Sequence, residues 1–545
     1  MGKNGNSNVN APAVELNMTN VDLNPNASTN NSNDRPMGKF SRRISNVSTA
    51  IQMKFRATRE EGDFTLGCLK LFHTRTRFLM MVLVLLCLAS VWSNILTFNF
   101  AVICMAPAHS TSNITSLNGT DEKPPIEFTP RQKSLLTAAV AASALAANFP
   151  VVTLVNQFGI RTVFSILGLL SAVATCLVPT ATYYGYYYVL GARVLQGIAF
   201  AANFPVIGAF TSKWTYYKQN GLFVSVLVAY VQLSPALTMP VSGTLCTSPW
   251  GWPSVYYAHG IFSLILFILF GTFYRNSPGK HPFVGDVEIK KIAVGKTECS
   301  KEELRRIPYG PILKTASVWA VWIAAIGNFT CVNMMFLYSP SYLHHVLKFQ
   351  VHSTGLSAAI PPFLQFSIKL FAGFTSDKVR CISETAKLKV YNSIAFFGSA
   401  IFLAVLAYGP TDYQMICLAI LGVAAGILGF TTGGFFKAGP LVSKHYSHFV
   451  TGNVSLGITI TMLVVPFMVS GLAPNNTAEE WRYVFLTTGA VLCITNFIFL
   501  IAASAEPASW TTDEFSRNAS RNRIHSTTQA SMTTIREFAP EVKMG

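Results

Sequence analysis

A few cations are the residues of this chain that could do chemistry inside a membrane. Arg193 lies about a third of the way into one long apolar run, Lys369 lies inside another, and Lys437 ends a third. Because a buried guanidinium stays charged, it requires an anion or a set of hydrogen-bond acceptors. The apolar runs hold no Asp or Glu away from their ends. Arg193 is therefore predicted to bind an anion from outside the chain. The alternative is a structural Arg193 that backbone carbonyls, Gln196 or a facing Asn hold.

Neutral polar side chains accompany these cations. Ser90, Asn94 and Thr97 are spaced to share one face of a helix in the first run, and Asn328 lies in the seventh. Such residues either line a cavity or join helices by hydrogen bonds, and both interpretations stay open. Lys369 lies two turns from the end of its run, and its ammonium is expected to reach the membrane surface.

The elements that carry these residues are apolar runs. The chain has 545 residues, of which 51% are hydrophobic and 12% charged, about half the charged fraction of a soluble domain. Most runs reach the length of ~20 residues that a membrane-spanning helix needs. The sequence therefore predicts an all-α membrane protein with twelve transmembrane helices at 78–106, 133–155, 162–180, 184–212, 219–242, 255–274, 314–339, 353–374, 389–408, 413–437, 449–471 and 482–503.

The charged segment that follows the sixth run divides the chain into halves of six helices. This layout is typical of transporters that are built from two repeated halves, with a site between them near the membrane midplane. The domains expected are a disordered cytosolic tail, a six-helix bundle, a cytosolic central loop, a second six-helix bundle and a second disordered cytosolic tail: 1–75, 76–274, 275–313, 314–503 and 504–545.

Loop charges and glycosylation motifs indicate the orientation. The net charge of +17 is concentrated in short loops on one side, as expected of cytosolic loops, and both termini fall on that side. Three sequons, at Asn113, Asn118 and Asn475, fall on the opposite side, where glycosylation occurs. Sequons in the Asn-rich N-terminal tail are attributed to chance. The choice between the plasma membrane and a vesicular or lysosomal membrane stays open.

Composition and motifs also argue against several classes of protein. No basic stripe with interleaved aromatic residues lies on a soluble domain, so nucleic acid is not an expected partner. No CxxC occurs, so neither a zinc site nor a redox motif is indicated, and no metal or cofactor is expected. Neither a titratable cluster at membrane depth nor a catalytic soluble domain supports an enzyme. Six cysteines in or beside apolar runs are predicted to be small buried apolar residues: Cys87, Cys104, Cys176, Cys331, Cys417 and Cys493.

Short motifs at the ends of the runs resemble known transporters. The segment from Gly373 to Asp377 and Lys378 resembles the loop signature G-x-x-x-D-[RK] of the major facilitator superfamily. The matching first-half loop, from Asn156 to Arg161, has Asn where the superfamily usually has Asp. A further ordered set consists of Arg193-Val-Leu-Gln-Gly197, Trp252-Pro-Ser-Val-Tyr-Tyr257, Ser277-Pro-Gly-Lys-His-Pro282, Ile307-Pro-Tyr309, Thr315-Ala-Ser-Val-Trp-Ala320 and Glu480-Trp-Arg-Tyr-Val-Phe485.

The ordered set is similar to the anion:cation symporter family, which includes sialin, the vesicular glutamate and nucleotide transporters, and sodium–phosphate transporters. The resemblance covers about 78–510. It implies a major facilitator fold that moves a small organic or inorganic anion across the lipid bilayer by alternating access. It also implies that Arg193 matches the fourth-span arginine that is implicated in binding the substrate anion.

Other family positions differ in this chain. Thr97 stands near the position of a first-span Arg, Thr137 near that of a second-span His, and Phe200 at that of a fourth-span acid. Phe200 cannot carry a proton, which favours sodium-coupled or facilitative transport over a proton-coupled organic anion symporter. The remaining alternative is a receptor or scaffold that keeps the fold without transport. The candidate substrate-binding residues are Arg193, Asn94, Thr97, Thr137, Phe200 and Asn328.

Overall fold

The structure is a computed structural model that describes residues 67–105, 128–215, 219–293, 308–378 and 382–511. The chain divides into two compact units, Met1–Leu69 and Lys70–Gly545, and apart from the start of the first helix every described residue belongs to the second. Most of the two predicted tails lies outside the described residues, as do the sequons at Asn113 and Asn118.

Twelve helices in the described ranges are long and apolar enough to cross a membrane, which confirms the predicted number of spans. They coincide with the predicted runs to within a few residues at most ends. Their bounds are Arg75–Met105, Pro130–Phe158, Ile160–Tyr184, Tyr186–Trp214, Leu222–Cys246, Pro253–Phe273, Ala316–Val346, Val351–Ser376, Glu384–Tyr408, Gln414–Ser443, Phe449–Leu472 and Ala478–Ala502.

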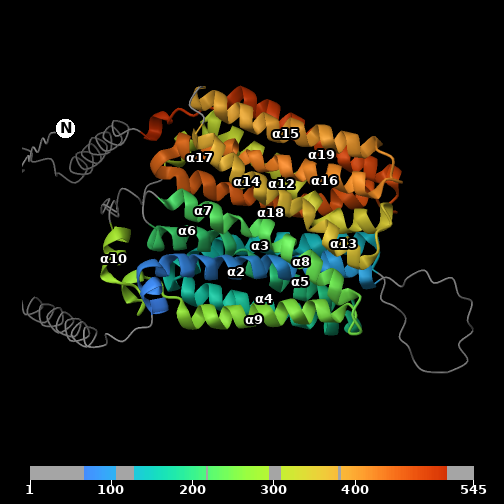
Figure 1. The fold of residues 1–545 in the computed structure, drawn as a ribbon, viewed down its shortest axis with the longest axis horizontal. Helices are drawn as coiled ribbons and strands as arrows, with labels where there is room; N and C mark the ends of the chain where they lie inside the picture. Colours follow the sequence, from blue (N-terminus) through green and yellow to red (C-terminus); the bar gives the residue numbers. More distant parts are fainter. Residues whose placement is uncertain (1–66, 106–127, 216–218, 294–307, 379–381, 512–545) are drawn as a thin grey trace, which may run out of the picture. The chain divides into compact units, whose positions relative to one another are not determined.

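The helices form two bundles of six spans (Figure 1). In the first bundle, α4 packs on both α5 and α9, and α3 packs on α5. In the second, α15 packs on α19, and α12 packs on α18 and α19. The first bundle comprises α2 (Gly67–Met105), α3 (Pro130–Phe158), α4 (Ile160–Tyr184), α5 (Tyr186–Phe200), α6 (Asn203–Trp214), α7 (Asn220–Val228), α8 (Tyr230–Cys246) and α9 (Pro253–Phe273). The second comprises α12 (Ala316–Ser341), α13 (Val351–Ala358), α14 (Ile360–Lys378), α15 (Glu384–Tyr408), α16 (Gln414–Ile427), α17 (Phe435–Ser443), α18 (Ser447–Leu472) and α19 (Ala478–Ala502).

One span is clearly interrupted. The fourth, fifth and eighth spans each consist of two helices in succession, α5 and α6, α7 and α8, and α13 and α14, and the one or two residues between them keep helical backbone angles. The tenth passes through a 3₁₀ turn, η4 (Leu428–Gly433), between α16 and α17. At Gly429 a β-carbon would lie 2.6 Å from the backbone nitrogen of Lys369, so only glycine lets this turn rest on α14. Broken helices at membrane depth are tolerated where they face protein or a cavity.

The turn between α3 and α4 is formed by the loop from Asn156 to Arg161, which matches the superfamily signature in the first half of the chain. Gly159 has a φ of +80°, which favours glycine. The Asn276 side chain occupies the space where a β-carbon of Gly159 would lie, and its Oδ1 accepts from the Arg161 backbone N–H at 2.9 Å. Arg161 Nε donates to the Gly271 carbonyl at 2.8 Å. The turn is thereby fastened to the end of α9.

The central segment is partly helical. It contains α10 (Asp286–Ala293) and α11 (Tyr309–Leu313), with residues 294–307 outside the described ranges. Glu288 on α10 is buried, and its carboxylate accepts from the backbone N–H groups of Thr76 and Arg77 at 3.2 and 3.1 Å. It satisfies donors at the start of the first span, as a capping side chain does. We call the end of the bundles where these contacts occur the central-loop end.

A disulfide joins Cys104 at the end of α2 to Cys246 at the end of α8. The prediction that Cys104 is a small buried apolar residue is therefore wrong, because spacing along the chain does not reveal which cysteines meet. The remaining cysteines named above are free, and three of them are buried: Cys87, Cys331 and Cys417. We call the end of the bundles that carries the disulfide the disulfide end.

The two bundles contact each other along α3 with α18 and along α8 with α13 and α14. Near the disulfide end, a β-carbon on Gly355 would lie 2.6 Å from the Met239 carbonyl oxygen and 2.9 Å from the Cα of Gly243. Ser134 Oγ donates to the Pro466 carbonyl across the α3–α18 contact at 3.1 Å. The bundles are therefore in backbone-close contact at this end.

We expect Gly355→Val to separate the bundles at the disulfide end, because its side chain cannot fit against the backbone of α8. A cysteine introduced at the buried Ser134 should then react with a polar maleimide several times faster than in the parent protein. Gly452→Val is the matched control, because the space beside Gly452 is open. Unchanged labelling in Gly355→Val would contradict this description of the contact.

Candidate functional site

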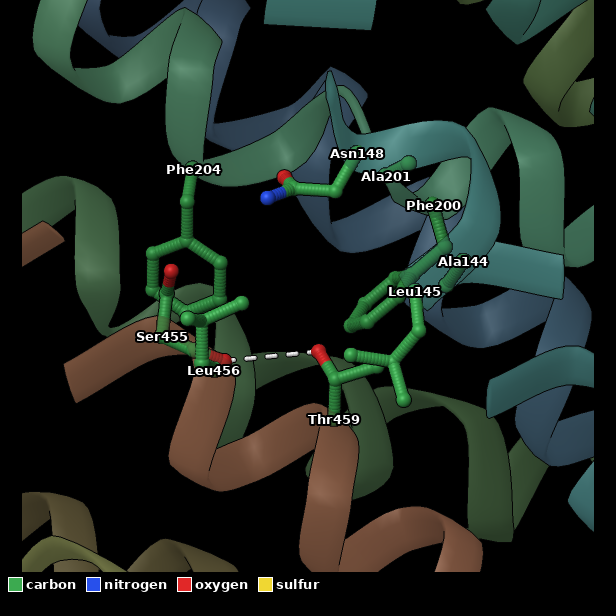
Figure 2. A pocket seen from close by; sticks show the side chains of 9 residues that line it. All are labelled: Ala144, Leu145, Asn148, Phe200, Ala201, Phe204, Ser455, Leu456 and Thr459. Atoms are coloured by element: carbon green, nitrogen blue, oxygen red, sulfur yellow. Dashed lines mark hydrogen bonds between the residues drawn. The ribbon is translucent and has the colours of Figure 1, made fainter. Parts of the chain in front are cut away.

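Two small pockets lie between the bundles. The first is lined by α3, the end of α5, the start of α6 and α18, and Asn148, Phe204 and Thr459 are among its lining side chains (Figure 2). The second is lined by the end of α7, by α8, α12 and α14, and by the interrupted tenth span. Its residues are Val228, Val231, Gln232, Asn328, Phe329, Gln365, Lys369, Leu428, Gly429, Thr431 and Phe436.

Both pockets lie away from the contacts at the disulfide end. At a rise of about 1.5 Å per residue, Lys369 is ~20 Å along the eighth span from Gly355. Phe204 and Asn148 are similarly displaced from the disulfide ends of their spans. The bundles are thus closed at the disulfide end, with the pockets between them displaced toward the central-loop end.

Arg193 is completely buried inside the first bundle. Its Nε donates to the Leu136 carbonyl at 3.2 Å, and its Nη1 donates to the Ile95 carbonyl at 3.1 Å and to Gln196 Oε1 at 2.8 Å. The guanidinium also lies 4.8 Å from the centre of the Phe98 ring. Arg193 lines neither pocket. Arg193 is therefore held by a cage of hydrogen-bond acceptors, which is the alternative to anion binding that the sequence left open.

The polar stripe of the first span supports that cage. Gln196 Nε2 donates to the Asn94 carbonyl at 3.1 Å and to Thr175 Oγ1 at 2.8 Å. Asn94 Nδ2 donates to Ser171 and Ser263, and Thr97 Oγ1 donates to the Asn94 carbonyl. In this conformation Asn94 and Thr97 join helices by hydrogen bonds and do not line the pockets.

One nitrogen of Arg193 remains available. Nη2 is buried and has no hydrogen-bond partner within the described part of the chain. The Tyr338 hydroxyl, from α12 of the second bundle, lies near Arg193 and near the side chains of Thr137 and Ser134. Thr137 itself donates to Asn99 Oδ1 at 3.1 Å. Arg193 therefore lies beside the closed contact between the bundles.

Phe200 and Asn328 are the predicted site residues that reach the pockets. Phe200 lines the first pocket and packs on Trp92 with ring centres 5.2 Å apart. Asn328 lines the second, and its Oδ1 is buried without a partner among the described residues. Sequence reasoning missed Lys369, which also lines the second pocket, because its distance from the helix end suggested that it reaches the membrane surface.

The loop signature lies at the central-loop end of α14. Gly373 and Lys378 are described, and the Lys378 ammonium lies 4.1 Å from the centre of the Phe374 ring; the Asp377 side chain is outside the described residues.

The sequon residue Asn475 lies exposed at the disulfide end, where its Nδ2 donates to Glu480 at 2.8 Å. Among the described residues, no group of three His, Cys, Asp or Glu could hold a metal ion.

Two solved transporters share this fold. A bacterial homolog of the human lysosomal transporter Spinster superposes with a TM-score of 0.58 at 14% identity, covering 78% of this chain and 97% of that one. The xylose transporter XylE from E. coli gives a TM-score of 0.55 at 13% identity, covering 78% and 96%. Two bundles of six spans that enclose pockets between them define a membrane transporter of the alternating-access type.

The chain belongs to the Major Facilitator Superfamily, whose sequence profile matches residues 78–452. Sialin of Homo sapiens is 26% identical over 351 residues, which is 64% of this chain and 70% of sialin. Vesicular glutamate transporter 3 of Danio rerio is 25% identical over 413 residues, 74% of this chain and 69% of the relative. The resemblance to the anion:cation symporters is confirmed. These relatives are transporters and not enzymes.

Arg193→Gln is expected to destabilise the protein, because it removes the hydrogen bonds that the guanidinium donates to the Ile95 and Leu136 carbonyls and to Gln196 Oε1. A buried hydrogen bond from a charged group contributes about 1.5–3 kcal/mol. Thermal unfolding of the purified protein in detergent measures the change. Arg482→Gln is the control, since Arg482 is exposed and donates a single hydrogen bond, to Ala407. Equal melting temperatures of Arg193→Gln and the parent would contradict the acceptor cage.

Proposed function

We propose that the protein transports a small organic or inorganic anion by alternating access, with Arg193 as one of its anion contacts. The observation that carries this proposal is a buried guanidinium without a carboxylate. Between Asp63 and Asp286 the acidic residues are Asp121, Glu122 and Glu127, all in one loop. No span of the first bundle can therefore supply a counter-ion. The anion transporters among the relatives support the same conclusion.

Arg193 would meet the anion in the conformation opposite to the one described. Its unpaired Nη2 lies beside Tyr338, Thr137 and Ser134, where the bundles touch. If the bundles part at the disulfide end, Tyr338 leaves with the second bundle and Nη2 faces the opening. Asn94 and Thr97 hold Arg193 in place, whereas Phe200 and Asn328 contact the anion further along its path.

The coupling we propose is to sodium, or to no ion. A proton relay needs a group that titrates at membrane depth. Phe200 lines the first pocket where a carboxylate is expected in proton-driven relatives. Neutral oxygens remain as potential sodium ligands, and Asn94 Oδ1 is buried without a partner in the described residues.

Uptake into proteoliposomes that contain the full chain tests this function. The probes are N-acetylneuraminate, L-glutamate, urate and phosphate, each under a pH gradient, a sodium gradient and no gradient. We expect accumulation of at least one anion with sodium, or equilibration without a gradient, and loss of that flux in Arg193→Gln that is inserted normally. No flux of any probe would favour the receptor or scaffold alternative. Accumulation driven by the pH gradient would contradict the coupling we propose.

We also propose that the disulfide end faces away from the cytosol and that both termini are cytosolic. Disulfides persist in oxidising compartments, and the Cys104–Cys246 bond lies at the same end as the sequon Asn475. The central-loop end, with its basic segments, would then face the cytosol. The compartment itself stays between the plasma membrane and vesicular or lysosomal membranes.

Glycosidase treatment of protein from a eukaryotic host tests the orientation. Each glycosylated site should lose its glycan when its asparagine is replaced, in the variants Asn113→Gln, Asn118→Gln and Asn475→Gln. The triple variant should run like the deglycosylated parent protein. Asn26→Gln, in the N-terminal tail, is the control and should change nothing. A glycan lost from Asn26→Gln would reverse the proposed orientation.

A further inference from the structure

The second pocket contains a cation that the structure leaves without a counter-ion. Lys369 on α14 is half-buried and lines this pocket. No hydrogen bond or ion pair reaches its ammonium from any residue in the described ranges. Its described contact is the Phe436 ring, whose centre lies 5.2 Å away. A cation over an aromatic face recovers about 0.5–2 kcal/mol, much less than a buried charge loses on leaving water.

A lysine near the end of a span can extend its ammonium to the membrane surface. Lys369 lies seven residues before Ser376, the end of its span, or about 10 Å from that end. Its ammonium is instead directed to Phe436 on the tenth span, beside η4. Gly429 lets η4 rest on the backbone of Lys369, which fixes the base of the side chain against the pocket.

Amide side chains complete the polar part of the pocket. Gln232, Gln365 and Asn328 are all at least 94% buried and line it with Lys369. Gln232 Oε1 and Asn328 Oδ1 have no partner among the described residues. Gln232 Nε2 donates to Gln365 Oε1 at 3.4 Å, a long bond that joins the first bundle to the second. Each amide can donate to an anion or accept from a hydroxyl or amide group of a ligand.

We propose that this pocket binds the carboxylate of a singly charged organic anion, with Lys369 as its counter-ion and Gln232, Gln365 and Asn328 as hydrogen-bond partners. The proposal rests on the proposed function and identifies the inner anion site. The lining contains one cation and no second one, which matches a monoanion better than a dianion. Phe329 and Phe436 provide an apolar wall for the carbon skeleton.

The position of the pocket links binding to bundle movement. Gln232 belongs to α8 and Gln365 to α14, so an anion that bonds both amides would replace their long mutual bond with two contacts to itself. Arg193 lies in the first bundle toward the disulfide end, and Lys369 lies in the second bundle toward the central-loop end. An anion crossing the protein would therefore meet a cation of each bundle in turn.

Lys369→Met tests the proposal, because it keeps the length of the side chain and removes the charge. We expect the half-saturating concentration for uptake of N-acetylneuraminate or L-glutamate to rise about tenfold or more, the effect of losing a charge-assisted hydrogen bond. The variant without anion should melt at a higher temperature than the parent, since an unpaired charge is gone. Lys369→Arg should retain part of the uptake.

Lys314→Gln is the matched control, because it removes a lysine charge from an exposed position just before α12. It should change neither uptake nor melting. Normal uptake by Lys369→Met would overturn the site, because the anion would then not need the charge. A melting temperature below that of the parent would also overturn it, because it indicates a structural lysine.

A thermal shift keeps this proposal separate from the proposed function. N-acetylneuraminate or L-glutamate should raise the melting temperature of the parent and of Lys314→Gln but not that of Lys369→Met. If the parent takes up no anion, the proposed function fails, while this shift alone still decides whether Lys369 binds a carboxylate. An equal shift in Lys369→Met would overturn the site even if that variant takes up less anion than the parent.

Discussion

The first bundle is organised around a buried positive charge that its own chain cannot neutralise. Arg193 has no carboxylate within its bundle, so carbonyl groups of α2 and α3 and the amide of Gln196 hold it. Those carbonyls must belong to helices that approach α5 closely. Gly197 permits this approach, because any β-carbon there would collide with the Val140 carbonyl of α3. The spacing of the three helices therefore depends on the Arg193 guanidinium and on Gly197.

The second bundle handles its buried cation differently. Lys369 is surrounded by neutral amides and an aromatic ring, and the described residues offer it no ion pair. Arg193 donates to three acceptors through Nε and Nη1, whereas Lys369 has an uncompensated desolvation cost that a ligand can remove. Arg193 is therefore mainly structural in the described conformation, whereas Lys369 is available to bind a ligand. Proteins commonly accept such local instability where function requires it.

The spans and their grouping could be predicted because membrane-spanning length and loop charge are properties of the sequence itself. The cage around Arg193 could only be given as an alternative, since two of its acceptors are backbone atoms of Ile95 and Leu136, which composition does not reveal. The Lys369 pocket was missed because it depends on the break at η4, which places Phe436 opposite the lysine. The pairing of Cys104 with Cys246 required knowledge of which helix ends are neighbours. Motif resemblance supplied the family but not these contacts.

The bond between Cys104 and Cys246, which are 142 residues apart in the sequence, closes a covalent ring that includes the second to fifth spans. A peptide bond cut anywhere within that ring leaves the two pieces attached to each other. The disulfide also ties the end of α8, which contacts α13, to the end of α2. When the bundles rock, these two helix ends must move together. An opening at this end can therefore widen between the bundles but not by separation of α2 from α8.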